Sequence, residues 1–116
     1  MLNSERIENF RRAKILVIGD SMIDRYWWGS VSRISPEAPV PVVRLEKTEL
    51  MAGGAANVAA NVAGLGAEAI LISPVGDDEA GAELPRILEK AGVAARDLIR
   101  LNGWRTIVKT RIVAHK

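Results

Sequence analysis

The sequence of 116 residues contains no cysteine, only one histidine and no run of like charge. Without cysteine the chain cannot be a disulfide scaffold, and its composition fits a reducing compartment. The 16 Lys and Arg residues nearly balance 14 Asp and Glu residues, giving a formal net charge of +2, so a polyanion-binding tail is excluded. His115 has no second histidine or cysteine with which to bind zinc, and we expect it to be solvated.

Neither a secretory signal nor a membrane span is predicted. Residues 1–12 are rich in charge and lack the apolar region and small-residue cleavage site of a signal peptide. Residues 51–75 are about long enough to cross a bilayer, but two asparagines, a glutamate and a proline interrupt them. We therefore expect a cytoplasmic protein whose partners are neither membranes nor nucleic acids.

The apolar content of 48% excludes disorder, and the length allows one hydrophobic core. Residues 4–12 are expected to form a short helix. The apolar run at residues 14–18 predicts a strand buried on both faces, as in a parallel sheet. Between residues 26 and 45, valines alternate with prolines after two tryptophans, which favours an edge strand or a projecting flap. Residues 106–114 read as a further extended strand.

Two helices are expected between these strands. Val58, Val62 and Leu65 recur at helical spacing, and Gly66 stands where a helix ends, so this small-residue helix should pack close to a sheet. Residues 69–73 then predict a buried strand, followed by a turn at 74–78. A second helix is expected to start at Asp78 and to end at a glycine, with a proline that kinks or shortens its first turns. The order is βαβα with added flap strands.

Three segments place polar residues or glycines at the carboxyl end of a strand or the start of a helix, where open α/β sheets bind ligands. They are residues 19–24, 53–57 and 76–81. Each also has a simpler explanation, namely a solvated turn, a flexible loop with an ordinary helix cap, or a turn and cap. The carboxylates at 77–79 could hold Mg²⁺, but such residues more often interact with the helix dipole.

Taken together, these three segments resemble the N-terminal part of the ribokinase (PfkB) family of carbohydrate kinases. The segments Gly19-Asp-Ser-Met-Ile-Asp-Arg-Tyr-Trp-Trp-Gly29 and Ser32-Arg-Ile-Ser-Pro-Glu-Ala-Pro-Val-Pro-Val-Val43 are most similar to the branch that phosphorylates heptose 7-phosphate. The resemblance runs from about residue 14 to the end. It implies a ribokinase-like three-layer α/β/α fold, incomplete here, with a mostly parallel sheet and a small β-flap that acts as a lid.

The resemblance also implies which residues bind the sugar. Asp24 and Asn57 would bind its hydroxyls, and Gly53 and Gly54 would allow the ligand to approach the backbone. We further expect Arg33, Lys109 or Arg111 to meet the phosphate that the sugar already carries, because cations on a closing flap suit an anion. The flap implies a homodimer, and Trp27 and Trp28 are expected to pack in it or at the dimer contact rather than to stack on bases.

The family's later Gly-Ala-Gly-Asp segment, which supplies the catalytic base and the anion hole, does not occur in this sequence. Residues 1–116 are therefore expected to be the N-terminal part of one kinase domain, with no catalytic residue and no metal site. The base would lie downstream of Lys116, and ATP and Mg²⁺ would be bound fully only by the longer enzyme. Residues 1–116 alone should be inactive and marginally stable.

Two alternatives stay open. The chain could belong to another sugar kinase of the same family, or it could be a truncated, non-catalytic remnant that folds or dimerises with a partner. Met22 stands where many family members have an asparagine, which weakens a ribose kinase and suits the heptose branch.

Overall fold

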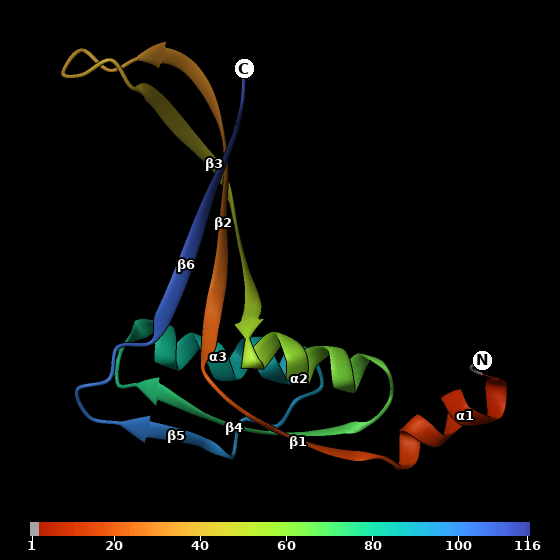
Figure 1. The fold of residues 1–116 in the computed structure, drawn as a ribbon. Coiled ribbons are helices and arrows are strands. Elements are labelled where there is room, and N and C mark those ends of the chain that lie inside the picture. The colour runs from red at the N-terminus through yellow and green to blue at the C-terminus, as the bar shows by residue number, and fades with distance from the viewer. Residues whose placement is uncertain (1–2) are drawn as a thin grey trace.

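The base of the molecule is a three-stranded parallel sheet covered by helices on one face (Figure 1). The structure is a computed structural model that describes residues 3–116. The sheet order is β1-β4-β5, with β1 at Lys14–Ile18, β4 at Glu68–Gly76 and β5 at Leu98–Leu101. The covering helices are α2 (Ala55–Gly64) and α3 (Glu79–Lys90), and the chain starts with α1 (Ser4–Glu8) and a 3-10 helix (Asn9–Arg12). The expected α/β class with a parallel sheet is confirmed.

A second sheet projects from this base as the expected flap (Figure 1). Its order is β3-β2-β6, with β2 at Ser21–Ile34, β3 at Pro41–Gly54 and β6 at Ile107–His115. β3 runs antiparallel to β2, whereas β6 runs parallel to it. The radius of gyration is 18.1 Å, whereas a compact chain of this size has one of about 13 Å. The larger radius of gyration reflects the flap, which extends away from the core.

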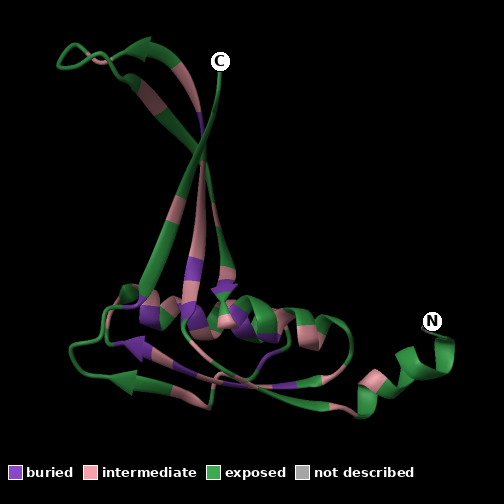
Figure 2. Cartoon of the chain, viewed as in Figure 1, coloured by how far each residue is buried: buried purple, intermediate pink, exposed green. Residues whose placement is uncertain are grey.

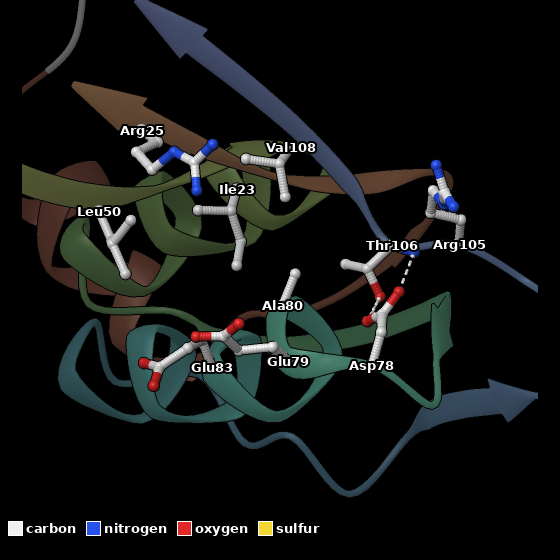
Figure 3. Close-up of a pocket in the computed structure, with 10 residues that line it drawn as sticks. All are labelled: Ile23, Arg25, Leu50, Asp78, Glu79, Ala80, Glu83, Arg105, Thr106 and Val108. Carbon is white, nitrogen blue, oxygen red and sulfur yellow. Dashed lines mark hydrogen bonds between the residues drawn. The ribbon is translucent and has the colours of Figure 1, made fainter. Parts of the chain in front are cut away.

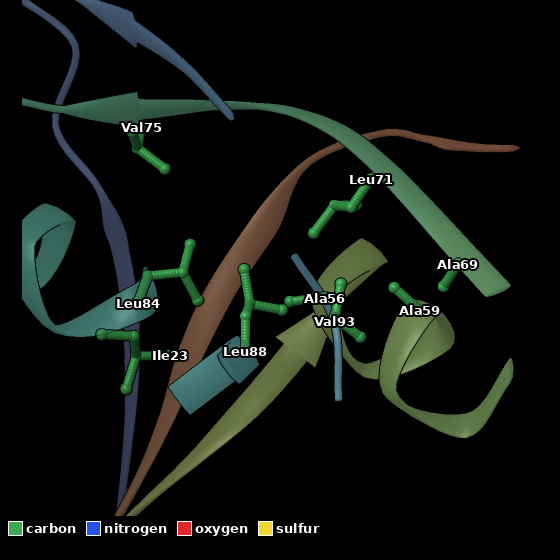
Figure 4. Packing of buried hydrophobic residues seen from close by; sticks show 9 residues of the cluster. All are labelled: Ile23, Ala56, Ala59, Ala69, Leu71, Val75, Leu84, Leu88 and Val93. Carbon is green, nitrogen blue, oxygen red and sulfur yellow. The ribbon is translucent and has the colours of Figure 1, made fainter. Parts of the chain in front are cut away.

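The hydrophobic core lies between the parallel sheet and its two helices (Figures 2 and 4). Alternate residues of β4 point toward the helices, because successive side chains of a strand face opposite ways. The core residues are Ile23, Ala56, Ala59, Ala69, Leu71, Val75, Leu84, Leu88 and Val93. Ile23 is the flap's contribution, so the base of the flap is packed into the core rather than hinged outside it.

One expectation about burial is wrong, and one is confirmed. β1 is not buried on both faces, since Leu16 is 55% exposed and Ile18 70% exposed. The reason is that helices cover only one face of the sheet in residues 3–116, so the expected three layers are represented there by two. α2 packs close to the sheet as expected: Ala56 and Ala59 are buried and Val62 packs against the core, while Val58 and Leu65 are exposed. Small alanines let this helix approach the sheet closely.

The chain after β4 also differs from the expectation. The predicted turn at 74–78 is wrong in its first half, because β4 continues to Gly76 and pairs with β5, a strand that the sequence did not indicate. α3 begins at Asp78, whose side chain caps it, and passes through Pro85 to Lys90 without ending early. None of the helices in residues 3–116 is long and apolar enough to cross a membrane.

Candidate sugar-binding site

Asp24 lies near the base of the flap, where three strands meet. It is on the central strand β2, in register with Met51 of β3 and with Lys109 of β6. Lys109 Nζ lies 3.0 Å from Asp24 Oδ1, and the Asp24 side chain is 21% exposed. Oδ1 is buried and has no hydrogen-bond partner of good geometry, so charge rather than a directed bond joins the two groups. This leaves Oδ2 as the oxygen that can accept a hydrogen bond from a ligand.

Gly53 and Gly54 shape the backbone beside Asp24. A Cβ on Gly53 would lie 3.0 Å from Asp24 Oδ2 and 2.7 Å from Cγ of Met22. The carboxylate therefore sits directly against the bare Gly53 backbone. Gly54 has φ +59, a conformation that other residues rarely adopt, and it turns the chain from β3 into α2. Both glycines were predicted as site residues; the structure places Gly53 against Asp24, whereas Gly54 lies beside Asp20 and Met22.

Asn57 is exposed in the first turn of α2, three residues after Gly54. It lines a cavity of about 790 Å³ with Met51, Ala52 and residues of α2 and α3. Met51 is the register partner of Asp24, but Asp24 itself does not line this cavity. The structure therefore does not bring Asn57 and Asp24 into one group.

The three cations expected to meet a phosphate lie in different places. Arg33 is nine residues beyond Asp24 on β2, a distance of about 30 Å along an extended strand. That exceeds the length of a monosaccharide phosphate, so Arg33 cannot contact the same sugar as Asp24 within one chain. Lys109 is paired with Asp24. Arg111 lies on the same face of β6 as Lys109, with its guanidinium 5.9 Å from the Tyr26 ring centre.

The opposite face of the flap forms a different cavity, of about 660 Å³, against α3 (Figure 3). Ile23 and Arg25 line it from β2, on either side of Asp24, whose side chain points the other way. The Arg25 guanidinium is braced there by Thr110 Oγ1 at 3.0 Å and by the Trp27 ring. This cavity is therefore separate from the Asp24 group.

The third predicted segment, residues 76–81, is a structural clamp. Asp78 Oδ1 accepts hydrogen bonds from the Gly81 amide and the Thr106 hydroxyl, both at 2.7 Å, and Oδ2 accepts one from the Thr106 amide at 2.9 Å. Figure 3 shows the bonds between Asp78 and Thr106. The Gly76 amide donates to Thr106 Oγ1 at 2.9 Å. The clamp joins the last residue of β4 and the start of α3 to the start of β6. Hydrogen bonds from Thr106 and Gly81 hold the pKa of Asp78 below its ordinary value.

This clamp bears on metal binding. Both carboxylate oxygens of Asp78 are occupied by hydrogen bonds, so Asp78 is not free to hold Mg²⁺ with its neighbours. Within residues 3–116, no group of three or more His, Asp or Glu side chains is placed to bind a metal ion. The residues present therefore do not fit a Mg²⁺ site.

Two buried polar contacts could not be found from the sequence. The Ser21 amide donates to Ser73 Oγ at 2.9 Å and ties the start of β2 to β4. Thr106, only 4% exposed, is the centre of the clamp. A single serine or threonine forms no recognisable sequence pattern, whereas two glycines before a helix do.

These features define a class of protein. The parallel sheet with its helices and the projecting β-flap form the α/β fold that this chain shares with solved carbohydrate kinases. A carbohydrate kinase from Agrobacterium tumefaciens matches 87% of this chain with a TM-score of 0.65 and 30% identity, over 31% of its own length. An uncharacterized sugar kinase from Pyrococcus horikoshii in complex with ATP matches 84% with a TM-score of 0.59 and 30% identity, over 30% of its length.

The profile of the pfkB family of carbohydrate kinases matches residues 12–116, and the chain belongs to this family. The bifunctional protein HldE of Pseudomonas aeruginosa is 55% identical over 105 residues, which are 90% of this chain and 22% of that protein. The chain thus spans about a fifth of the length of the curated relatives it matches.

Proposed function

We propose that this chain is the N-terminal, sugar-binding part of a kinase domain that phosphorylates D-glycero-D-manno-heptose 7-phosphate at its anomeric hydroxyl. The observation that carries the proposal is the Asp24 carboxylate, seated on the Gly53 backbone at the base of the flap. The identity of 55% to HldE and the likeness of residues 19–43 to the heptose branch of the family support the choice of sugar.

Each residue has a role in this proposal. Oδ2 of Asp24 accepts a hydrogen bond from a sugar hydroxyl, and the amide of Asn57 binds a neighbouring hydroxyl. Gly53 and Gly54 let the sugar approach the backbone. Arg111 binds the 7-phosphate, because it lies two residues from Lys109 on the Asp24 face, a shift of about 7 Å along the strand. Arg33 of the same chain has no part in this site, because it lies too far along β2.

The remaining catalytic parts lie outside residues 1–116 in this proposal. The base, the anion hole, and the residues that bind ATP and Mg²⁺ would come from the rest of the kinase domain, in keeping with the poor fit of a metal to this chain. ATP as phosphoryl donor is supported by the ATP bound to the Pyrococcus sugar kinase. Dependence on ATP in turn favours the cytoplasm as the site of reaction.

We propose a homodimer that forms through the flap. Apolar side chains lie exposed along its strands, among them Trp28 on β2 and Ile112 and Val113 on β6. Burying them against a second flap would be favourable, since apolar surface removed from water stabilises an assembly. Measuring the molar mass in solution, with Ile112→Ser as the variant, tests this: the wild type should be dimeric and the variant monomeric.

The experiment that tests the kinase function is an ATP-dependent phosphorylation assay on the polypeptide as its source cells make it. The substrates are heptose 7-phosphate, ribose and fructose, and products are identified by mass and NMR. We expect the 1,7-bisphosphate from the heptose alone and no turnover by residues 1–116 by themselves. A preference for another sugar would point to a different kinase of the family, and no turnover of any sugar would point to a non-catalytic remnant.

A further inference from the structure

The ion pair between Lys109 and Asp24 is unusual among those of the flap. Lys47 and Glu49 pair on the same face, but they lie on an edge strand, where Lys47 is exposed and Glu49 half-exposed. In contrast, Asp24 is mostly buried on the central strand, and its Oδ1 is shut off from water without a hydrogen-bond partner. A buried carboxylate oxygen is costly unless a cation lies beside it. Lys109 supplies that cation.

The surroundings of the carboxylate fix its orientation. Rotation of an aspartate carboxylate about its last bond is soft and roughly two-fold, so the backbone alone does not hold it. Here the Lys109 ammonium lies 3.0 Å from Oδ1 on one side, and Oδ2 rests on the Gly53 backbone on the other. The ammonium and the glycine together select one orientation, with Oδ2 toward the ligand.

We infer that Lys109 is a positioning residue, which holds the Asp24 carboxylate ready to accept a sugar hydroxyl, and is not the residue that binds the sugar's phosphate. The inference rests on the proposed sugar-kinase function. It assigns the two cations of β6 separate tasks: Lys109 orients the carboxylate and Arg111, two register pairs further on, meets the phosphate. Loss of Lys109 should therefore lower the affinity by the same factor for a sugar with phosphate and for a sugar without it.

The test is calorimetric titration of two sugars, heptose and heptose 7-phosphate, into the polypeptide as its source cells make it. Lys109→Met removes the charge and keeps the chain length, and Lys109→Arg restores a cation. Lys47→Met is the matched control, since it removes a lysine of the same sheet face that pairs elsewhere. Arg111→Met serves as the phosphate-specific comparison. Circular dichroism checks folding, and Lys109→Gln replaces Lys109→Met if the latter unfolds.

We expect Lys109→Met to lower the affinity for both sugars about tenfold, the effect of losing one hydrogen bond to a charged group, here the bond from a sugar hydroxyl to the Asp24 carboxylate. Lys109→Arg should recover most of the affinity, Lys47→Met should change neither sugar, and Arg111→Met should weaken only the phosphorylated one. In an Asp24→Asn background, Lys109→Met should add nothing, because both changes remove the same interaction.

Three results would overturn the inference. If Lys109→Met weakens only heptose 7-phosphate, Lys109 binds the phosphate itself. If it weakens neither sugar, the pair has no role in binding. If the wild type binds neither sugar, the proposed function fails and the inference falls with it, a result distinguished by the wild-type titration alone.

Discussion

Replacing Thr106 with valine tests whether the clamp holds the flap to the core. The change keeps the shape of the side chain but removes the hydroxyl, which accepts from the Gly76 amide and donates to Asp78. Thr106 is 4% exposed, so water cannot replace it at the buried Gly76 amide. A buried donor left without an acceptor costs about 1–3 kcal/mol. We expect Thr106→Val to lower the free energy of unfolding by about 2 kcal/mol.

The assay is thermal unfolding followed by circular dichroism. For a chain of about 100 residues, a loss of about 2 kcal/mol lowers Tm by roughly 8 °C. Thr48→Val is the matched control, because Thr48 is exposed on β3 and the same change there should cost no more than about 0.5 kcal/mol. Equal Tm values for Thr106→Val and the wild type would refute the view that this hydroxyl joins β4, α3 and β6.

Three further predictions concern pH, the site and the core. Hydrogen bonds lower the pKa of Asp78 from 3.8, so the stabilising effect of this carboxylate is complete above pH 3.8 and is lost below it as the carboxylate protonates. Tm should therefore fall more between pH 5 and pH 2 in the wild type than in Asp78→Asn. Gly53→Ala should abolish sugar binding in titrations while leaving the circular dichroism spectrum unchanged, because its Cβ displaces the Asp24 carboxylate. Leu88→Ala, at a fully buried position, should cost about 2–5 kcal/mol in denaturant unfolding, and a cost below about 1 kcal/mol would contradict the described core.

The elements that sequence patterns predicted are those with local signals. The apolar run of β1, the proline-rich flap and the helix beginning at Asp78 all rest on spacing or on single residues with strong local preferences. β5 was missed because Leu98–Leu101 is short, and it is held by pairing with β4 that no local pattern reveals. The burial of β1 was predicted wrongly, since it depends on which face of the sheet other elements cover.

In the candidate site, too, the residues with local sequence signals were predicted and the long-range contacts were not. Asp24 and the two glycines were indicated by segments that resemble a known family, and the structure places one of the glycines, Gly53, against Asp24. The pairing of Lys109 with Asp24, two residues more than 80 positions apart in sequence, depends on the register of β6 against β2. The distance of Arg33 from Asp24 follows from the length of β2, which the sequence left undefined.

The central claim is that Asp24 at the base of the flap binds the sugar. The most direct measurement is the affinity for heptose 7-phosphate of the polypeptide as its source cells make it, compared between the wild type and Asp24→Asn by calorimetric titration. Asn keeps the size of the side chain and removes its charge, so we expect binding to the wild type and a loss of at least about tenfold in the variant. Equal affinity in the two proteins would contradict the account.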